Sequence, residues 1–106
     1  MRSVDECMLM DFYGNLLTEK MRNTMELYLD DDLSLSEIAD SENISRQGVH
    51  DTINRARKQL QNYEEKLGLV ERFSSQLALI DEAIRLIDED DAEGAKALLM
   101  ALKTEI

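Results

Sequence analysis

The sequence contains no proline, no tryptophan, a single cysteine and four glycines among its 106 residues. Aromatic residues make up 5% of the chain, whereas apolar residues make up 43% and charged residues 33%. This scarcity of turn-forming and aromatic residues argues against a turn-rich β-sheet protein, and the composition is typical of helices. We therefore predict an all-α fold with enough apolar residues to form a core of its own.

Cysteine is too scarce for a disulfide framework, because Cys7 has no partner in the chain. It lies in an apolar helical pattern, where a reduced thiol usually packs as a small hydrophobe. The start of the chain lacks the basic and apolar blocks of a signal peptide, and the longest apolar run, residues 97–102, is too short to cross a membrane. These absences predict a cytoplasmic protein with no membrane insertion.

Positive charge is also scarce, and the formal net charge is −11. Such a charge opposes general binding to nucleic acid, because Lys and Arg supply most of the non-specific attraction to phosphates. The distribution is uneven: residues 1–44 carry 3 basic and 11 acidic side chains, residues 45–58 carry 4 and 1, and residues 59–106 carry 5 and 11. The single basic segment predicts weak, orientation-dependent and salt-sensitive binding to DNA, or a partner other than bulk DNA.

The stretch from residue 34 to residue 58 predicts a helix-turn-helix motif. Ser34 and Glu37 have the spacing of a capping box, which starts a short helix. Asn43 tolerates the left-handed conformation that ends helices, and Ser45 supplies the N-cap of a longer helix, Arg46 to Leu67. A small residue at the helix crossing and an apolar wedge complete the motif, whose structural residues are Leu35, Ile38, Ala39, Ile44, Val49 and Ile53.

The second helix of the motif presents a polar and mostly basic face. Arginine pairs with guanine, and glutamine or asparagine with adenine, when such a helix lies in a major groove. The alternative is an ordinary helical hairpin whose polar face meets water, and Asp51 fits base reading poorly because it pairs more simply with Arg55. We predict that a serine orients the helix on a phosphate, that four side chains meet base edges and that three cations hold the backbone. In chain order these residues are Ser45, Arg46, Gln47, His50, Asn54, Arg55, Arg57 and Lys58.

The acidic runs predict no metal site, and no residues predict catalysis. A calcium loop requires Gly at its sixth position and Glu at its twelfth, and the loops that start at residues 30 and 88 have neither. Asp90 is more simply the N-cap of the last helix, with Glu93 completing a capping box. His50 is the only histidine and has no nucleophile or metal-ligand set nearby in sequence. We therefore expect no enzymatic activity and no cofactor.

Apolar residues at helical spacing predict two further helices before the motif. The first runs from about Ser3 to Tyr13, with Val4 on its apolar side and Gly14 as its C-cap. The second follows an N-cap at Thr18. Both are expected to contribute to the core.

Beyond Gly68 the apolar residues step by three and four, which is the pattern of a heptad seam wide enough for one partner helix. The seam either folds a C-terminal hairpin onto the chain's own helices or joins two chains. We favour a homodimer, because helix-turn-helix proteins usually read two half-sites. We predict a helix-turn-helix domain over residues 1–67 and a C-terminal packing or dimerisation segment over 68–106. The seam consists of Val70, Phe73, Leu77, Ile80, Ile84 and Ile87, and the last helix repeats its step.

The motif resembles the YlxM family of small bacterial helix-turn-helix proteins. The resemblance is carried by SRQGVHD at residues 45–51, YLDD at 28–31, LSEIA at 35–39 and YEEKL at 63–67, and it covers residues 16–69. The helix-turn-helix is itself similar to region 4 of bacterial sigma factors, although the chain has no counterpart of the other sigma regions.

This resemblance implies a cytoplasmic protein whose gene tends to neighbour those of the signal recognition particle and its receptor, and which assists or regulates that pathway. The chain departs from the family at Gly48, where Ala is favoured, and at His50, where an aromatic residue is frequent. Two hypotheses follow. The protein is a DNA-binding regulator, or it is an adaptor that binds a protein or RNA component of the signal recognition particle.

Overall fold

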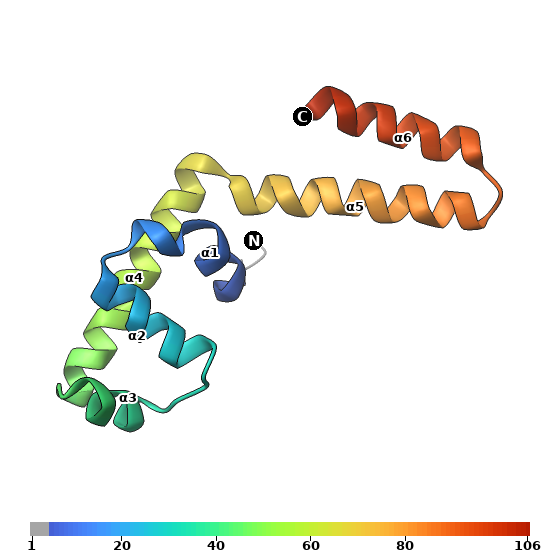
Figure 1. The fold of residues 1–106 in the computed structure, drawn as a ribbon. Helices are drawn as coiled ribbons and strands as arrows, with labels where there is room; N and C mark the ends of the chain where they lie inside the picture. The colour runs from blue at the N-terminus through green and yellow to red at the C-terminus, as the bar shows by residue number, and fades with distance from the viewer. Residues whose placement is uncertain (1–4) are drawn as a thin grey trace. The chain divides into compact units, whose positions relative to one another are not determined.

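The structure, a computed structural model, describes residues 5–106. Within this range it is built from helices without strands, so the predicted all-α fold is confirmed (Figure 1). The contacts divide the chain into unit 1, Met1–Val70, and a C-terminal hairpin, Glu71–Ile106. The functional division predicted from the sequence, at residues 67 and 68, stays a prediction. The elements are α1 (Glu6–Tyr13), the 3-10 helix η1 (Gly14–Leu16), α2 (Glu19–Leu29), α3 (Leu35–Glu42), α4 (Arg46–Leu67), α5 (Leu69–Asp88) and α6 (Ala92–Glu105).

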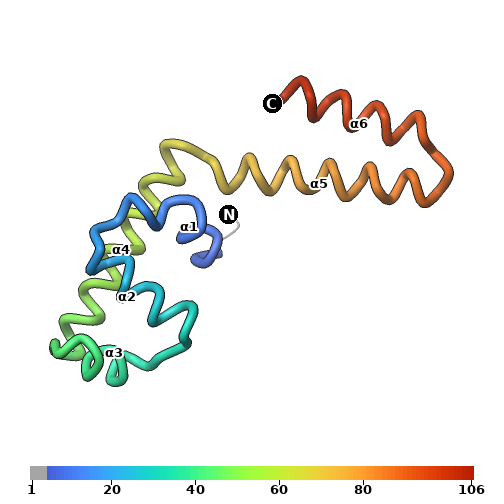
Figure 2. Tube along the Cα trace, in the orientation of Figure 1, coloured from blue at the N-terminus to red at the C-terminus, as the bar shows by residue number. Residues whose placement is uncertain are grey.

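Unit 1 is assembled around α4, which contacts α1, α2 and α3. Figure 2 traces α3 beside the first turns of α4 and α1 farther along it. The core takes side chains from all four helices, and Met25, Ile38, Val49 and Leu60 are each 0% exposed. The long apolar line of α4 is therefore covered by the helices that precede it in the chain.

The first helix differs in detail from its prediction. Asp5 Oδ1 accepts a hydrogen bond from Cys7 N at 2.8 Å, and the helix begins at Glu6. The predicted start near Ser3, with Val4, lies outside the described residues. Gly14 is the C-cap, but its φ of −56° is right-handed, and the chain continues into η1.

Two side chains in this region have environments that the sequence did not predict. A Cβ on Gly14 would lie 3.3 Å from Met10 Cε, so close packing explains this glycine better than turn geometry does. Cys7 is exposed, and the prediction that it packs as a small hydrophobe is wrong. The apolar side of this short helix is supplied by other residues, with Leu9 only 2% exposed.

The junction between α4 and α5 is a single residue, Gly68, whose φ of 62° ends α4 as predicted. The first amides of α5 are held by unit 1. Leu69 N donates to the hydroxyl of Tyr13 at 3.1 Å, Val70 N donates to Glu64 Oε1 at 3.0 Å, and the Tyr13 hydroxyl donates to the same Glu64 oxygen at 2.6 Å. Val70 is 4% exposed and belongs to the unit 1 core, so it is not available to the predicted seam.

The C-terminal hairpin consists of the remainder of α5 and the antiparallel α6 (Figure 1). Asp90 adopts a left-handed conformation with φ 61° in the turn, and Asp91 caps α6 by accepting from Gly94 N at 2.9 Å. The predicted cap at Asp90 is therefore wrong by one residue, because Asp90 is used to reverse the chain. At the open end of the hairpin, Arg72 Nη2 donates to the carbonyl of Glu105 at 3.3 Å.

Candidate nucleic-acid interface

Local hydrogen bonds fix the two helices of the predicted motif. Ser34 Oγ accepts from Glu37 N at 3.1 Å while Glu37 Oε1 accepts from Ser34 N at 3.1 Å, which is the predicted capping box. Asn43 ends α3 with φ 56°, as predicted. Ser45 Oγ then accepts from Gly48 N at 3.0 Å and starts α4. The chain thus turns from α3 into α4 over three residues.

A wedge of apolar side chains fills the angle between these helices. Ile38, Ala39, Val49 and Ile53 are 0%, 5%, 0% and 3% exposed. The two remaining members of the predicted set, Leu35 and Ile44, are partly buried and pack against the core. Because Ala39 is small, α3 can cross α4 closely at this point. The same packing determines which face of α4 is left in solvent.

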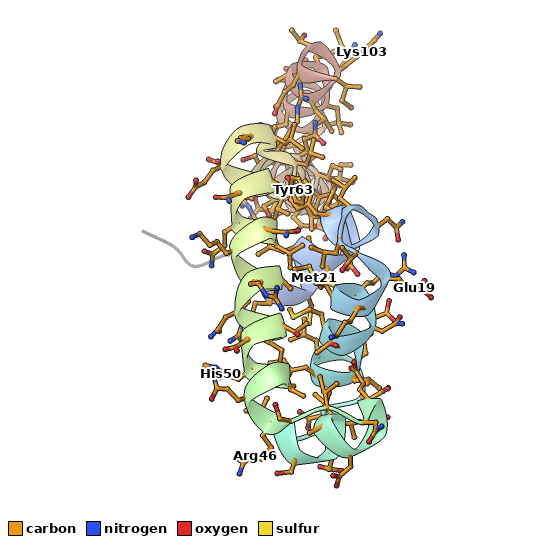
Figure 3. The ribbon with its side chains drawn as sticks, turned by 90° about the vertical axis from the view of Figure 1, so that its left-hand side faces the viewer. Glu19, Met21, Arg46, His50, Tyr63 and Lys103 are labelled. Carbon is orange, nitrogen blue, oxygen red and sulfur yellow. The ribbon has the colours of Figure 1, made fainter. Side chains whose placement is uncertain are left out.

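The outward face of α4 begins at its first turn. Figure 3 shows Arg46 and His50 pointing away from the neighbouring helices. A shallow depression lined by Leu35, Arg46, Gln47 and His50 lies where the start of α3 meets the start of α4. Seven of the eight predicted nucleic-acid-binding residues are exposed: Ser45, Arg46, Gln47, His50, Asn54, Arg55 and Lys58.

Several of these side chains contact one another along the helix. Gln47 Nε2 donates to Asp51 Oδ1 at 2.9 Å, and Asn54 Nδ2 lies 3.4 Å from His50 Nδ1. Asp51 therefore turns toward the residue one turn before it, and no ion pair with Arg55 occurs in the described part of the chain. Exposed pairs of this kind stabilise a helix by only about 0.2–0.5 kcal/mol, so they can be exchanged for contacts to a ligand.

Arg57, the eighth predicted residue, has a different environment. Its Nε lies 2.5 Å from Glu6 Oε1 in an ion pair, its Nη2 donates to Glu6 Oε2 at 3.2 Å, and its guanidinium carbon lies 5.3 Å from the ring centroid of Tyr28. It thereby fastens α1 and α2 to α4. Sequence reasoning missed this contact because Glu6 is 51 residues away in the chain.

The arginines of the described residues divide into those whose side chains have a partner and those whose side chains have none. Six arginines fall within residues 5–106, and the side chains of two of these, Arg46 and Arg55, form neither an ion pair nor a hydrogen bond within that range. Lys58, one turn after Asn54, also has no ion pair there. The cations of the predicted interface are thus uncompensated in an acidic protein. The paired arginines are Arg22 with Glu26, Arg57 with Glu6, Arg72 with the Glu105 carbonyl, and Arg85 with Glu82 and Glu89.

Among the described residues, no group of three His, Cys, Asp or Glu side chains could hold a metal ion. None of the helices described has both the length and the apolar character that crossing a membrane requires.

Comparison with known proteins gives matches over most of the chain. A family model, UPF0122, described as "Putative helix-turn-helix protein, YlxM / p13 like", matches residues 2–98. A UPF0122 protein of Symbiobacterium thermophilum is 43% identical over 98 residues, which are 92% of each chain. Similar proteins occur in Desulforamulus reducens, with 54% identity over 76% of this chain and 69% of the relative, and in Shouchella clausii, with 50% identity over 79% and 77%.

Proposed function

Because the chain belongs to the UPF0122 family of YlxM/p13-like helix-turn-helix proteins, we propose that α4 is a recognition helix and that the protein is a DNA-binding regulator. The family resemblance noted over residues 16–69 is confirmed, and the match extends over residues 2–98. Membership in this family supports the helix-turn-helix motif. The proposal that the ligand is DNA rests on the surface chemistry of α4.

The observation that carries this proposal is the set of uncompensated cations on α4. Arg46, Arg55 and Lys58 are exposed and have no ion pair among the described residues, whereas the flanking segments are strongly acidic. Phosphates would be repelled by the rest of the molecule and attracted along this face. Binding should therefore occur in one orientation, with α4 toward the nucleic acid.

The side chains divide into two roles on this face. Arg46, Gln47, His50 and Asn54 are exposed along the first turns of α4, and we assign them to base edges in a major groove. The start of α4, capped by Ser45, offers backbone amides to a phosphate. Arg55 and Lys58 hold the backbone, and Arg57 is left out of the interface because Glu6 and Tyr28 occupy it.

The proposal can be tested by fluorescence anisotropy with labelled genomic fragments across a range of salt concentrations. We expect weak binding that falls as salt rises, and Arg46→Ala should lower the affinity for every fragment bound. Lys96→Ala is the matched control, because it removes one exposed positive charge from α6. A binding curve that Arg46→Ala leaves unchanged, or that both variants lower equally, would contradict the role of α4.

A second function is favoured by the overall charge. The exposed acidic surface, which includes Asp30, Asp31 and Asp32, suits a basic protein partner, and the basic face of α4 suits RNA. On this alternative the protein is an adaptor that binds a component of the signal recognition particle, such as the RNA-binding domain of its GTPase. Purified particle RNA and GTPase, tested separately at low salt, should then bind while DNA does not. Failure of both to bind would remove this alternative.

We further propose that the protein acts in the cytoplasm as a non-catalytic homodimer without a cofactor. The single histidine, His50, is exposed on the proposed interface. Two copies would supply the two recognition helices that most helix-turn-helix regulators use.

A further inference from the structure

The C-terminal hairpin carries an exposed apolar face, which we define as Leu77, Ile80, Ile84 and Ile87 of α5 with Leu99 of α6. These side chains are 45%, 37%, 52%, 56% and 45% exposed. Soluble monomers rarely leave so many large aliphatic side chains together in water. The predicted heptad seam thus exists on the helix, but the hairpin itself does not cover it.

The two helices of the hairpin pack through a different line of residues. Ala83 and Ala95 are each 2% exposed, and Leu102 is 9% exposed. Successive residues advance by about 100° around a helix. Viewed along each helix from its N-terminus, Ile80 and Ile84 of α5 therefore lie to one side of Ala83, and Leu99 of α6 lies to the same side of Ala95 and Leu102. Since α5 and α6 are antiparallel, that common sense of rotation brings Leu99 to the same side as Ile80 and Ile84. The exposed residues are therefore on one side of both helices, which run side by side in Figure 1, and form one face.

The shape of this face fits a second copy of itself. Two flat helical hairpins that meet through such faces form a four-helix bundle, the usual way to bury this pattern. Each face is roughly 20 Å wide and roughly 25 Å long, or roughly 500 Å², against about 800 Å² per partner in an average stable complex. Two such faces bury roughly 1,000 Å² in total, which reaches the size of a specific interface but lies below the average, so we expect a dimer that dissociates readily.

Charge selects the relative direction of the two hairpins. The closed end carries the acidic run 88–91 and Glu93, and within this group Arg85 pairs with Glu89, so the closed end keeps an excess of negative charge. The open end mixes Arg72 and Lys103 with acidic residues. A parallel arrangement would bring two acidic turns together. An antiparallel arrangement places each acidic turn beside the open end of the other hairpin, where Arg72 and Lys103 lie.

We propose that two copies of the chain associate through the exposed apolar face as an antiparallel four-helix bundle. In antiparallel heptad packing, Leu77 meets the partner's Ile80 near a two-fold axis in the middle of α5. Phe73, the seam residue just before this face, is 42% exposed and meets the partner's Ile84. This inference deepens the homodimer of the proposed function and rests on that part alone, so loss of DNA binding would leave it standing.

The dimer is tested by sedimentation velocity of the full chain over a range of concentrations, without nucleic acid. We expect the wild type to dimerise and the double variant Ile80→Glu, Ile84→Glu to raise the dissociation constant by at least about a hundredfold, because two charges would be buried without partners. Ala78→Glu is the control, since Ala78 is exposed on the opposite side of α5 and the dimer should persist. A wild type that stays monomeric at all concentrations, or a double variant that stays dimeric, overturns the proposal.

Disulfide trapping tests the direction. In a Cys7→Ser background, Phe73→Cys with Ile84→Cys should give a crosslinked dimer on oxidation, whereas Ile84→Cys alone should not. The two positions lie roughly 16 Å apart along one helix, too far for a bond within one chain. Crosslinking of Ile84→Cys alone would indicate a parallel dimer and overturn the antiparallel arrangement.

Discussion

Unit 1 and the C-terminal hairpin use the same helical spacing of apolar residues with opposite results. In unit 1, Val49 and Leu60 of α4 are 0% exposed because three other helices cover α4. In the hairpin, Ile84 and Ile87 are 52% and 56% exposed because α6 covers a different line of α5. The comparison teaches that apolar spacing predicts a helix and its apolar face. Whether that face is covered depends on how many other helices the chain can pack against it.

The largest expected effect is a difference in the loss of stability when one aliphatic residue is truncated in each region. Leu60→Ala should lower the free energy of unfolding by about 2–5 kcal/mol, because it leaves a cavity in an enclosed core. Ile84→Ala, measured at concentrations where the chain is monomeric, should cost less than about 1 kcal/mol. Urea denaturation followed by circular dichroism measures both. Equal losses would show that Ile84 is buried within the monomer and would break the contrast.

A smaller loss is expected where unit 1 holds the start of α5. Tyr13→Phe removes the hydroxyl that accepts from Leu69 N and donates to Glu64, so each of these partly buried groups loses one hydrogen-bond partner. The expected cost is about 1–3 kcal/mol, with faster hydrogen exchange at the Leu69 amide. Unchanged exchange there would mean that the amide has another acceptor.

The same hydroxyl predicts a dependence on alkaline pH. Burial, reinforced by the hydrogen bond to Glu64, raises the pKa of Tyr13 above its ordinary value of 10.0. The folded chain therefore keeps this proton after the unfolded chain begins to lose it, and the stability is complete below pH 10.0 and falls as pH rises further. Tyr13→Phe should remove this part of the alkaline loss. The prediction is tested by measuring the denaturation midpoints of the wild type and of Tyr13→Phe from neutral to alkaline pH.

Substitution of two arginines on α4 should affect different properties: one the stability of unit 1 and the other the binding of nucleic acid. Arg57→Ala should cost about 1 kcal/mol, because it removes a partly exposed ion pair to Glu6 and the contact with Tyr28. Arg55→Ala should change stability by less than about 0.5 kcal/mol and should weaken nucleic-acid binding. Thermal unfolding and anisotropy on the same two variants provide the test. A reversal of the two effects would move Arg57 back into the interface.

The smallest effect is expected at Gly48. Alanine in a helix is favoured over glycine by up to about 1 kcal/mol, but a Cβ here would lie 3.2 Å from Ser45 Oγ. The capping hydroxyl must shift slightly, so we expect Gly48→Ala to stabilise unit 1 by less than about 0.5 kcal/mol. A clear loss of stability in thermal unfolding would show that the Ser45 cap has no room to adjust.

Sequence reasoning predicted the parts of this molecule that depend on near neighbours. The capping box of Ser34, the corner at Asn43 and the stop at Gly68 each follow from a few adjacent residues, and all are present. The shift of the α6 cap from Asp90 to Asp91 was not predictable, because either carboxylate can cap a helix and the backbone of the turn decides between them.

The candidate site was predictable to the same extent. The exposed and buried sides of α4 followed from helical spacing, and Arg46 projects into solvent as that spacing requires. The separation of Arg57 from the other cations did not follow, because it depends on Glu6, which folding brings from the other end of unit 1. Charge on a helix face is thus readable from sequence, whereas its neutralisation by a distant residue is not.

The hold of unit 1 on the first turn of α5 decides where the chain can be shortened. A protein that stops at Leu67 would lose Val70 from the core and leave the Tyr13 hydroxyl and Glu64 without the amides they accept from. Truncation after the glycine that separates the two long helices would therefore damage the fragment it was meant to isolate. A cut placed beyond Val70, inside a continuous helix, is the one that leaves unit 1 whole.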